Sequence, residues 1–297
     1  MMIPTATQKT ADKLSMNIPF TKMHGLGNDF VVIDLVSQPN SLNPEQIRQF
    51  SDRQFGIGFD QLLQIEAAQG PEADFRYRIF NRDGSEVEHC GNGARCFAKY
   101  VHDKGLTSKN PVKVETINRL LSLSLTPTGE VSVDMGSPDF SPASLPFRAE
   151  HAQASYTREI TLDENLTATQ IEFGAVSMGN PHTVIRVDDV QTADVEGIGT
   201  ALGAHADFPQ GVNVGFMQII DRGSIRLRVF ERGAGETLAC GTGACAAVAV
   251  GQQQGLLDST VEVEVRGGKL TIEWTGNSNS MVMTGPATTV FEGCITL

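Results

Sequence analysis

The segment FNRDGSEVEHCGNGA, residues 80–94, occurs a second time in altered form as FERGAGETLACGTGA, residues 230–244. At an offset of 150 residues the two segments share Phe, Arg, Glu, Cys, Gly, Gly and Ala. A second pair, GNDFVVI from Gly27 and GNPHTVI from Gly179, repeats at an offset of 152. Internal repetition of this kind is the signature of duplicated structural units. The 297-residue sequence therefore predicts two similar domains.

Each copy predicts the same local structure around its cysteine. Strand-like residues precede it, and an apolar run of helical character follows it and stops at a glycine, Gly105 or Gly255, as a helix C-terminus does. The strand-like segments are FRYRIF (75–80), LLSLSL (120–125), EVSVDM (130–135), SIRLRVF (224–230) and the hairpin VEVEVRGGKLTIEW (261–274). We expect two strand-rich domains related by a pseudo-twofold axis, in which the segments after the cysteines are the principal buried helices. The run from Ala244 to Val250 is apolar all round and should be enclosed by sheet.

Domain boundaries follow from the same repeat. The segment MGSPDFSPASLPF, residues 135–147, is rich in proline and serine and is typical of a linker. We therefore expect a first domain over 18–135 and a second over 136–285. Residues 1–17 match nothing in the second half, which indicates an N-terminal extension.

Composition excludes several classes of partner. A formal charge of −12 disfavours nucleic acid and anionic membrane surfaces, which are bound through clustered basic residues. The N-terminus has no apolar signal region, and no apolar run approaches the roughly 18 residues of a membrane span. Five cysteines, an odd number, favour a reducing compartment, and their spacing lacks the paired pattern of zinc sites. We expect a cytoplasmic protein without a metal site.

The two repeated cysteines are the candidates for chemistry. Cys90 and Cys240 each precede Gly-x-Gly-Ala at the expected start of a helix, where unpaired N–H groups and the helix dipole favour negative charge. Such a position predicts a lowered thiol pKa or a stabilised thiolate, open to alkylation at mildly acidic pH. The glycines let a carboxylate approach the backbone donors.

Two such helix starts, facing one another, suit a proton transfer at a carbon next to a carboxylate. One thiolate removes the proton, the opposite thiol returns one on the other face, and the stereocentre is inverted. The oriented N–H groups would stabilise the carbanion. Two alternatives remain open for the pair: buried structural cysteines, which is the interpretation we apply to Cys96, Cys245 and Cys294, and a redox pair.

Other polar residues join the candidate site through their positions in the repeat. Asn28 and Asn180 are equivalent in the two copies, although Asn in such a place is often only a turn residue. His182 is expected near a thiol, where it would assist deprotonation. Arg232, next to Glu231, either holds a second carboxylate with two bonds or forms a simple ion pair.

Long motifs carry a family resemblance. They are KMHGLGNDFVVID (22–34), FNRDGSEVEHCGNGARCFA (80–98), GNPH (179–182), GVNVGF (211–216) and ERGAGETLACGTGACAA (231–247). Over about residues 20–292 the chain resembles the diaminopimelate epimerases. The resemblance implies a cofactor-independent isomerase that interconverts LL- and meso-2,6-diaminopimelate with two cysteines, in lysine and peptidoglycan precursor synthesis.

The resemblance also implies a fold and an assembly. The fold would be α+β, with two similar domains that are each a mainly antiparallel sheet or barrel around a central helix. A C-terminal segment of about residues 286–297 would return to the first domain. It further implies a homodimer and a small amino-acid substrate.

Carried over by motif, Cys90 and Cys240 are the acid/base thiols, and His182 and Glu231 tune them. The resemblance implies that the substrate is bound by Asn28, Gln61, Asn81, Gly91, Asn92, Asn180, Asn213, Glu231, Arg232, Gly241 and Thr242.

Two further functions are compatible with the same motifs. One is a racemase or epimerase of another amino acid, similar to proline racemase, which also uses paired cysteines. The other is an amino-acid-binding protein without activity, although binding alone gives no reason for two opposed thiols. Phenazine-biosynthesis-type isomerases of this fold group lack the paired thiols, which counts against them.

Overall fold

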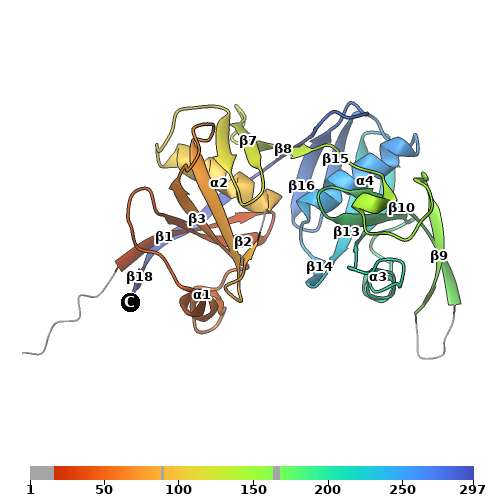
Figure 1. The fold of residues 1–297 in the computed structure, drawn as a ribbon, viewed down its shortest axis with the longest axis horizontal. Helices are drawn as coiled ribbons and strands as arrows, with labels where there is room; N and C mark the ends of the chain where they lie inside the picture. Colours follow the sequence, from red (N-terminus) through yellow and green to blue (C-terminus); the bar gives the residue numbers. More distant parts are fainter. Residues whose placement is uncertain (1–16, 88–89, 163–167) are drawn as a thin grey trace, which may run out of the picture.

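The computed structural model describes residues 17–87, 90–162 and 168–297, which form two lobes side by side (Figure 1). The first lobe contains β1 (Asn17–Gly25), β2 (Asn28–Asp34), α1 (Pro44–Ser51), β3 (Gln61–Ala67), β4 (Phe75–Asn81), β5 (Glu86–Val87), α2 (Gly91–Asp103), β6 (Val112–Glu115), β7 (Leu120–Leu125) and β8 (Val131–Gly136). The second contains η1 (Pro142–Ser144), β9 (Tyr156–Thr161), β10 (Ala168–Ser177), β11 (Pro181–Arg186), α3 (Val195–Gly203), β12 (Asn213–Asp221), β13 (Ser224–Glu231), β14 (Gly235–Thr237), α4 (Gly241–Gln253), β15 (Thr260–Val265), β16 (Gly268–Glu273) and β17 (Met281–Gly285). The last strand is β18 (Thr288–Thr296).

The two lobes repeat one topology. β2 and β3 run parallel in the first lobe, as β11 and β12 do in the second, and the parallel pair of β4 and β6 matches that of β13 and β15. The other ladders are antiparallel. An ion pair is repeated as well: Arg78 donates two hydrogen bonds to the carboxylate of Glu86, and Arg228 donates two to that of Glu236. The predicted α+β fold of two similar units is confirmed.

One helix lies at the centre of each lobe. α2 packs on β1, β2, β3, β7 and β8, while α4 packs on β10 to β13, β16 and β17. Both helices end as the sequence predicted, before glycines in the left-handed region, Gly105 at φ 65° and Gly255 at φ 72°. The largest apolar cluster contains residues from both helices, so one core runs through both lobes.

The lobes exchange their last strands. β9 follows the first lobe in sequence but pairs with β10 in the second, and β18 leaves the second lobe to pair with β1 in the first. A further ladder between β8 and β17 joins the lobes edge to edge. The two lobes are therefore tied together by two crossings of the chain and one ladder rather than by a single linker.

The predicted linker is partly core. Leu145 and Phe147, at its end, are buried in the second lobe, where the Phe147 ring stacks on Phe208 at 4.5 Å between centroids. Of the predicted extension, residues 1–16 lie outside the described residues, and Asn17 begins β1. None of the described helices combines the length and apolar character needed to cross a bilayer.

Candidate active site

Cys90 and Cys240 occupy equivalent positions as the N-caps of α2 and α4. Both have extended backbone dihedrals, and the helix begins at the glycine that follows. The N–H groups of Asn92 and Gly93 act to lower the pKa of the Cys90 thiol, and that of Gly243 acts to lower the pKa of the Cys240 thiol. Each thiol thus lies at a helix start whose first N–H groups are unpaired, but neither cysteine side chain caps its helix with a hydrogen bond.

A carboxylate faces the second thiol. Cys240 Sγ donates to Glu231 Oε2 at 3.2 Å and lies 3.6 Å from Thr242 Oγ1. The other carboxylate oxygen of Glu231 accepts a bond from the Thr237 hydroxyl, which fixes its orientation. Glu231 ends β13, so the repeated strand delivers its carboxylate to the start of α4.

An amide faces the first thiol. Cys90 Sγ donates to Asn28 Oδ1 at 3.6 Å, and Asn28 Nδ2 donates to Asp60 at 3.0 Å. An amide oxygen accepts a bond but does not take up a proton at neutral pH. The two thiols therefore have chemically different partners despite their equivalent positions.

The side chain of Asn92 connects the two helix starts. Its Nδ2 donates to Asn28 Oδ1 at 3.2 Å and to the carbonyl of Ala239 at 3.1 Å, and Ala239 precedes Cys240. Met283 also touches both: a Cβ on Gly91 would meet its Cε at 3.0 Å, and one on Gly241 its Sδ at 3.1 Å. A side chain at either position would press on Met283, so both helix starts lie against this one residue.

The remaining predicted residues of the first lobe gather at the ends of β2 to β4. Gln61 and Asn81 are opposite one another in the β3–β4 ladder, and Gln61 Nε2 donates to Asn81 Oδ1 at 3.0 Å. Gln61 Oε1 is buried and has no protein partner among the described residues. A buried acceptor without a partner is costly, so it offers a bond to a ligand donor.

In the second lobe the predicted residues form a chain that leads to Cys240. His182 Nε2 lies 3.1 Å from Asn180 Oδ1, and Asn180 Nδ2 donates to Thr242 Oγ1 at 3.4 Å. His182 contacts neither catalytic candidate directly in the described hydrogen bonds. Burial and the charge of Arg232 lower the pKa of His182 to about 3, so its imidazole is neutral at physiological pH.

The backbone N–H of Arg232 is hydrogen-bonded, and part of its guanidinium is free to bind a ligand. Its N–H donates to Asn213 Oδ1 at 2.9 Å, and Nη1 donates to the carbonyl of Gln210 at 2.7 Å. Asn213 is anchored in turn by a bond from its amide to the carbonyl of Pro181. Nε and Nη2 of Arg232 have no protein partner within the described ranges, and they form an edge that matches a carboxylate.

The thiol pKa values correct one expectation from the sequence. Burial raises the pKa of both thiols above the ordinary value, that of Cys240 well above it, with the charge of Glu231 adding in the same direction. The backbone N–H groups act to lower both values, as predicted, but burial outweighs them. Both thiols are therefore protonated near neutral pH in this state, and ready alkylation at mildly acidic pH is not expected.

The other cysteines separate into two groups. Cys96 and Cys245 are buried inside α2 and α4, and burial raises each thiol pKa to about 12. The expectation of a buried structural cysteine was wrong for Cys294, which is exposed on β18.

Comparison with known proteins identifies the family. A sequence model described as diaminopimelate epimerase matches residues 20–141 and 174–290, which include both cysteine motifs. The chain belongs to the diaminopimelate epimerase family.

Relatives named diaminopimelate epimerase share more than half of their residues with the chain. The relative from Chromobacterium violaceum is 58% identical over 282 residues, with 95% of this chain and 100% of the relative covered. The relative from Thioalkalivibrio sulfidiphilus is 57% identical, with 94% of this chain and 99% of the relative covered. The similarity therefore extends through both lobes.

Solved structures share the fold at much lower identity. A phenazine biosynthesis protein of the PhzF family from Bacillus anthracis has a TM-score of 0.66 and 16% identity, with 95% of this chain and 100% of that chain covered. A hydroxyproline epimerase from Agrobacterium vitis has a TM-score of 0.63 and 16% identity, covering 95% and 93%. At this identity the likeness shows the fold alone.

Several contacts of this epimerase-family site were not foreseen from the sequence. Asp60, Thr237 and Met283 hold the predicted residues, and Arg95 holds Asn92 from inside α2. Arg95 had a visible signal, since it is the one charged residue between Cys90 and Phe97 in a segment predicted to be enclosed by sheet. The others come from distant parts of the chain and carry no local pattern.

Replacing Glu231 by Gln is expected to lower the pKa of the Cys240 thiol. The wild-type carboxylate favours the protonated thiol by its charge and by accepting the S–H bond, so its removal favours the thiolate. Alkylation of Cys240 at a fixed pH of about 8 then becomes faster than in the wild type. Mass spectrometry of the alkylated peptides follows each cysteine separately.

Glu236→Gln is the matched control. Glu236 lies on the neighbouring strand and bonds to Arg228 rather than to a sulfur. If Glu231→Gln and Glu236→Gln give the same alkylation profile as the wild type, the carboxylate does not govern the Cys240 thiol.

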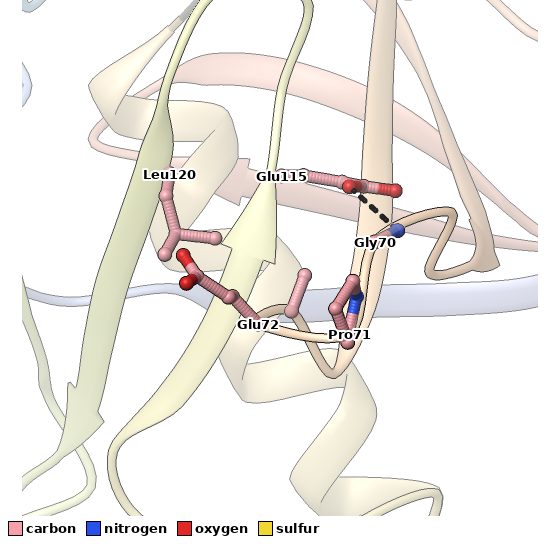
Figure 2. Close-up of a pocket in the computed structure, with 6 residues that line it drawn as sticks. Gly70, Pro71, Glu72, Glu115 and Leu120 are labelled. Carbon is pink, nitrogen blue, oxygen red and sulfur yellow. Dashed lines mark hydrogen bonds between the residues drawn. The ribbon is translucent and has the colours of Figure 1, made fainter.

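One surface pocket of this family member lies apart from the candidate site. Its volume is about 410 Å³, and it is lined by Gly70, Pro71, Glu72, Ala73, Glu115 and Leu120 (Figure 2). The Glu115 carboxylate already accepts the N–H groups of Gln69 and Gly70. None of the predicted catalytic or binding residues lines this pocket. Within the described residues, no cluster of His, Cys, Asp and Glu is arranged to hold a metal ion.

Proposed function

We propose that the protein interconverts LL- and meso-2,6-diaminopimelate, as an isomerase of lysine and peptidoglycan precursor synthesis. Family membership and the relatives' names support the substrate. One structural observation supports the chemistry: two thiols cap equivalent helices whose first turns are joined by the Asn92 side chain.

In the proposed reaction, the two thiols act on opposite faces of one α-carbon. The thiolate of one cysteine takes the α-proton, and the thiol of the other donates its proton to the opposite face, so the thiolate changes sides with each turnover. Glu231 is the acceptor towards which the Cys240 proton already points. The first N–H groups of α2 and α4, at Gly91, Asn92, Gly241 and Thr242, bind the α-carboxylate and stabilise the charge that develops next to it.

The second amino-acid group of the substrate explains the polar residues outside the thiol pair. Arg232 has a free guanidinium edge for the distal carboxylate, and Gln61 Oε1 is a free acceptor for an ammonium group. Asn28, Asn81, Asn180 and Asn213 complete the binding residues, and His182 acts on Cys240 through Asn180 and Thr242. A substrate with an ammonium and a carboxylate at each end requires this number of polar groups.

The domain division and the assembly belong to the same proposal. The first domain comprises residues 18–135 with the returning segment of about 286–297, and the second comprises residues 136–285. Pairing of β18 with β1 and of β9 with β10 supports this division. A homodimer in the cytoplasm is proposed from the family resemblance, and the exposed side chains of Val290 and Phe291 on β18 offer an apolar surface for it.

Proton NMR of the reduced protein with LL-diaminopimelate in D2O tests the function. The expected result is loss of the α-proton signal together with appearance of the meso isomer. If a folded, reduced sample gave neither signal but exchanged the α-proton of proline or another amino acid, the two-thiol chemistry would stand and the substrate would be wrong. If no amino acid exchanged, the protein would not be an epimerase.

A further inference from the structure

Arg95, on α2, is fully buried and has no carboxylate partner among the described residues. A buried cation without a counter-ion is costly, because the protein interior solvates charge poorly. Its hydrogen bonds must offset part of that cost. The groups that accept those bonds therefore indicate what the side chain does.

The guanidinium bonds to two separate parts of the chain. Nη2 donates to Asn92 Oδ1 at 3.0 Å, on the same helix, while Nε donates to the carbonyl of Pro286 at 3.1 Å, between β17 and β18. Nη1 lies 3.7 Å from Met283 Sδ on β17. Arg95 thus ties the start of α2 to the segment that crosses from the second lobe to the first.

The slot around the guanidinium is shaped by two glycines. A Cβ on Gly25, at the end of β1, would lie 3.1 Å from Nη2, and one on Gly285, at the end of β17, would lie 3.5 Å from Nε. The planar group is held between the ends of strands from both lobes. Its orientation is therefore fixed by backbone as well as by hydrogen bonds.

Asn92 and Met283, the two side chains that Arg95 contacts, each lie against the starts of both α2 and α4. Asn92 spans from Asn28, the partner of Cys90, to the carbonyl of Ala239, which precedes Cys240. Met283 lies against Gly91 and Gly241, the first residues of α2 and α4. Arg95 therefore fixes the positions of Asn92 and Met283, and each of these two residues contacts the starts of both α2 and α4.

The second copy of the repeat has no arginine at this position. At the offset of 150 residues Arg95 corresponds to Cys245, which is buried within α4. The guanidinium is thus not a feature that each domain needs for its own fold. A single group at the junction serves both lobes.

We propose that Arg95 is a positioning residue that aligns the two thiols on opposite faces of the substrate α-carbon. The inference rests on the proposed two-thiol function. Inversion requires that the C–H bond breaks towards one sulfur and that the new C–H bond forms from the S–H of the other. A small shift of α2 against α4 leaves the first step in place and removes the second. The charge of Arg95 also acts to lower the pKa of the Cys90 thiol, in keeping with a group that faces the site.

Arg95→Met tests the proposal, because Met fills much of the same volume without the hydrogen bonds. In D2O each productive abstraction ends either in inversion or in a deuterium returned to the same face. We expect kcat to fall about tenfold with little change in KM, since sub-ångström misplacement costs rate rather than binding. The ratio of deuterium exchange with retention to inversion should rise at the same time. Arg95→Lys keeps the charge but not the planar fork, so it should show the same change in ratio.

Cys96→Ala is the matched control, since Cys96 is the buried neighbour of Arg95 on α2 and has no bond to the site. Loss of folded protein lowers exchange and inversion together, so the control should keep the wild-type ratio even if it is less stable. An Arg95→Met protein with the wild-type ratio and kcat would overturn the positioning role. A wild type that neither exchanged nor inverted diaminopimelate would instead overturn the proposed function, so the two failures are distinguishable.

Discussion

Replacing either Cys90 or Cys240 by Ala is expected to abolish epimerisation in both directions. Each turnover needs one thiolate to remove a proton and one thiol to supply one, so a single remaining sulfur cannot complete inversion. A positioned acid or base contributes roughly 10²–10⁴-fold to a rate, and each variant loses one group that serves as both in turn. We expect kcat to fall by at least about 10³-fold.

The same two variants should differ in what they still catalyse. With Cys90→Ala, the remaining thiolate of Cys240 faces one side of the α-carbon and exchanges the proton of one stereoisomer only. Cys240→Ala should exchange the proton of the other. Deuterium incorporation from D2O into LL- and meso-diaminopimelate, measured separately, shows which thiol serves which face.

Cys96→Ala and Cys245→Ala are the matched controls, because both sulfurs are buried in the same helices. Both should retain activity per folded molecule, as judged by circular dichroism and thermal unfolding. Full activity in Cys90→Ala or Cys240→Ala would contradict the two-thiol mechanism, whereas loss in all four variants would point to damage to the helices.

Arg232→Ala should strongly reduce turnover of diaminopimelate without affecting the thiols. The free edge of the guanidinium is the proposed partner of the distal carboxylate, and hydrogen bonds to a charged group contribute about 2–3 kcal/mol once the substrate covers this exposed side chain. That corresponds to a decrease of roughly 30- to 150-fold in kcat/KM, carried mainly by KM. Arg232→Lys should recover only part of the loss, since an ammonium cannot make two parallel bonds.

Arg222→Ala is the control for loss of a surface arginine. Arg222 pairs with Asp258 at an exposed position, and its removal should leave kcat/KM unchanged. If Arg232→Ala behaved like Arg222→Ala, no distal carboxylate would be bound there. A smaller amino acid, as in the proline racemase-like alternative, would then be the better substrate.

Local features of the site could be predicted because they depend on residues that are close together in the sequence. The motif around each cysteine predicted a helix start at or near the thiol, and α2 and α4 begin at Gly91 and Gly241. The offset of 150 predicted the duplicated fold, since equal spacing of equal motifs requires equal intervening elements. The predicted strands at 75–80 and 224–230 are β4 and β13.

Features that depend on distant residues could not be predicted. The bond between Asn92 and Ala239 joins positions 147 residues apart, and that between Arg95 and Pro286 joins positions 191 apart. The predicted lowering of the thiol pKa values was wrong for the same reason. The helix start is a local feature that acts to lower the pKa, whereas burial depends on the packing of the whole protein and raises it. Leu145 and Phe147 were assigned to a linker because the proline content of the segment can be read from the sequence, whereas the burial of these two side chains cannot.

The exchange of β9 and β18 between the lobes suggests how such a chain arose. If one repeat were a separate half-length protein, its last strand would have no partner in its own lobe and would pair with the first strand of a second copy. The resulting assembly is a strand-swapped homodimer, with one cysteine from each subunit related by a true twofold axis. Fusion of the two copies in one gene would keep that geometry and let the halves diverge. Glu231, which faces the Cys240 thiol, corresponds to Asn81 in the first half, and Arg95 corresponds to Cys245 in the second. Sequence asymmetry within a symmetric frame then gives the two sulfurs chemically different partners, a carboxylate for Cys240 and an amide for Cys90.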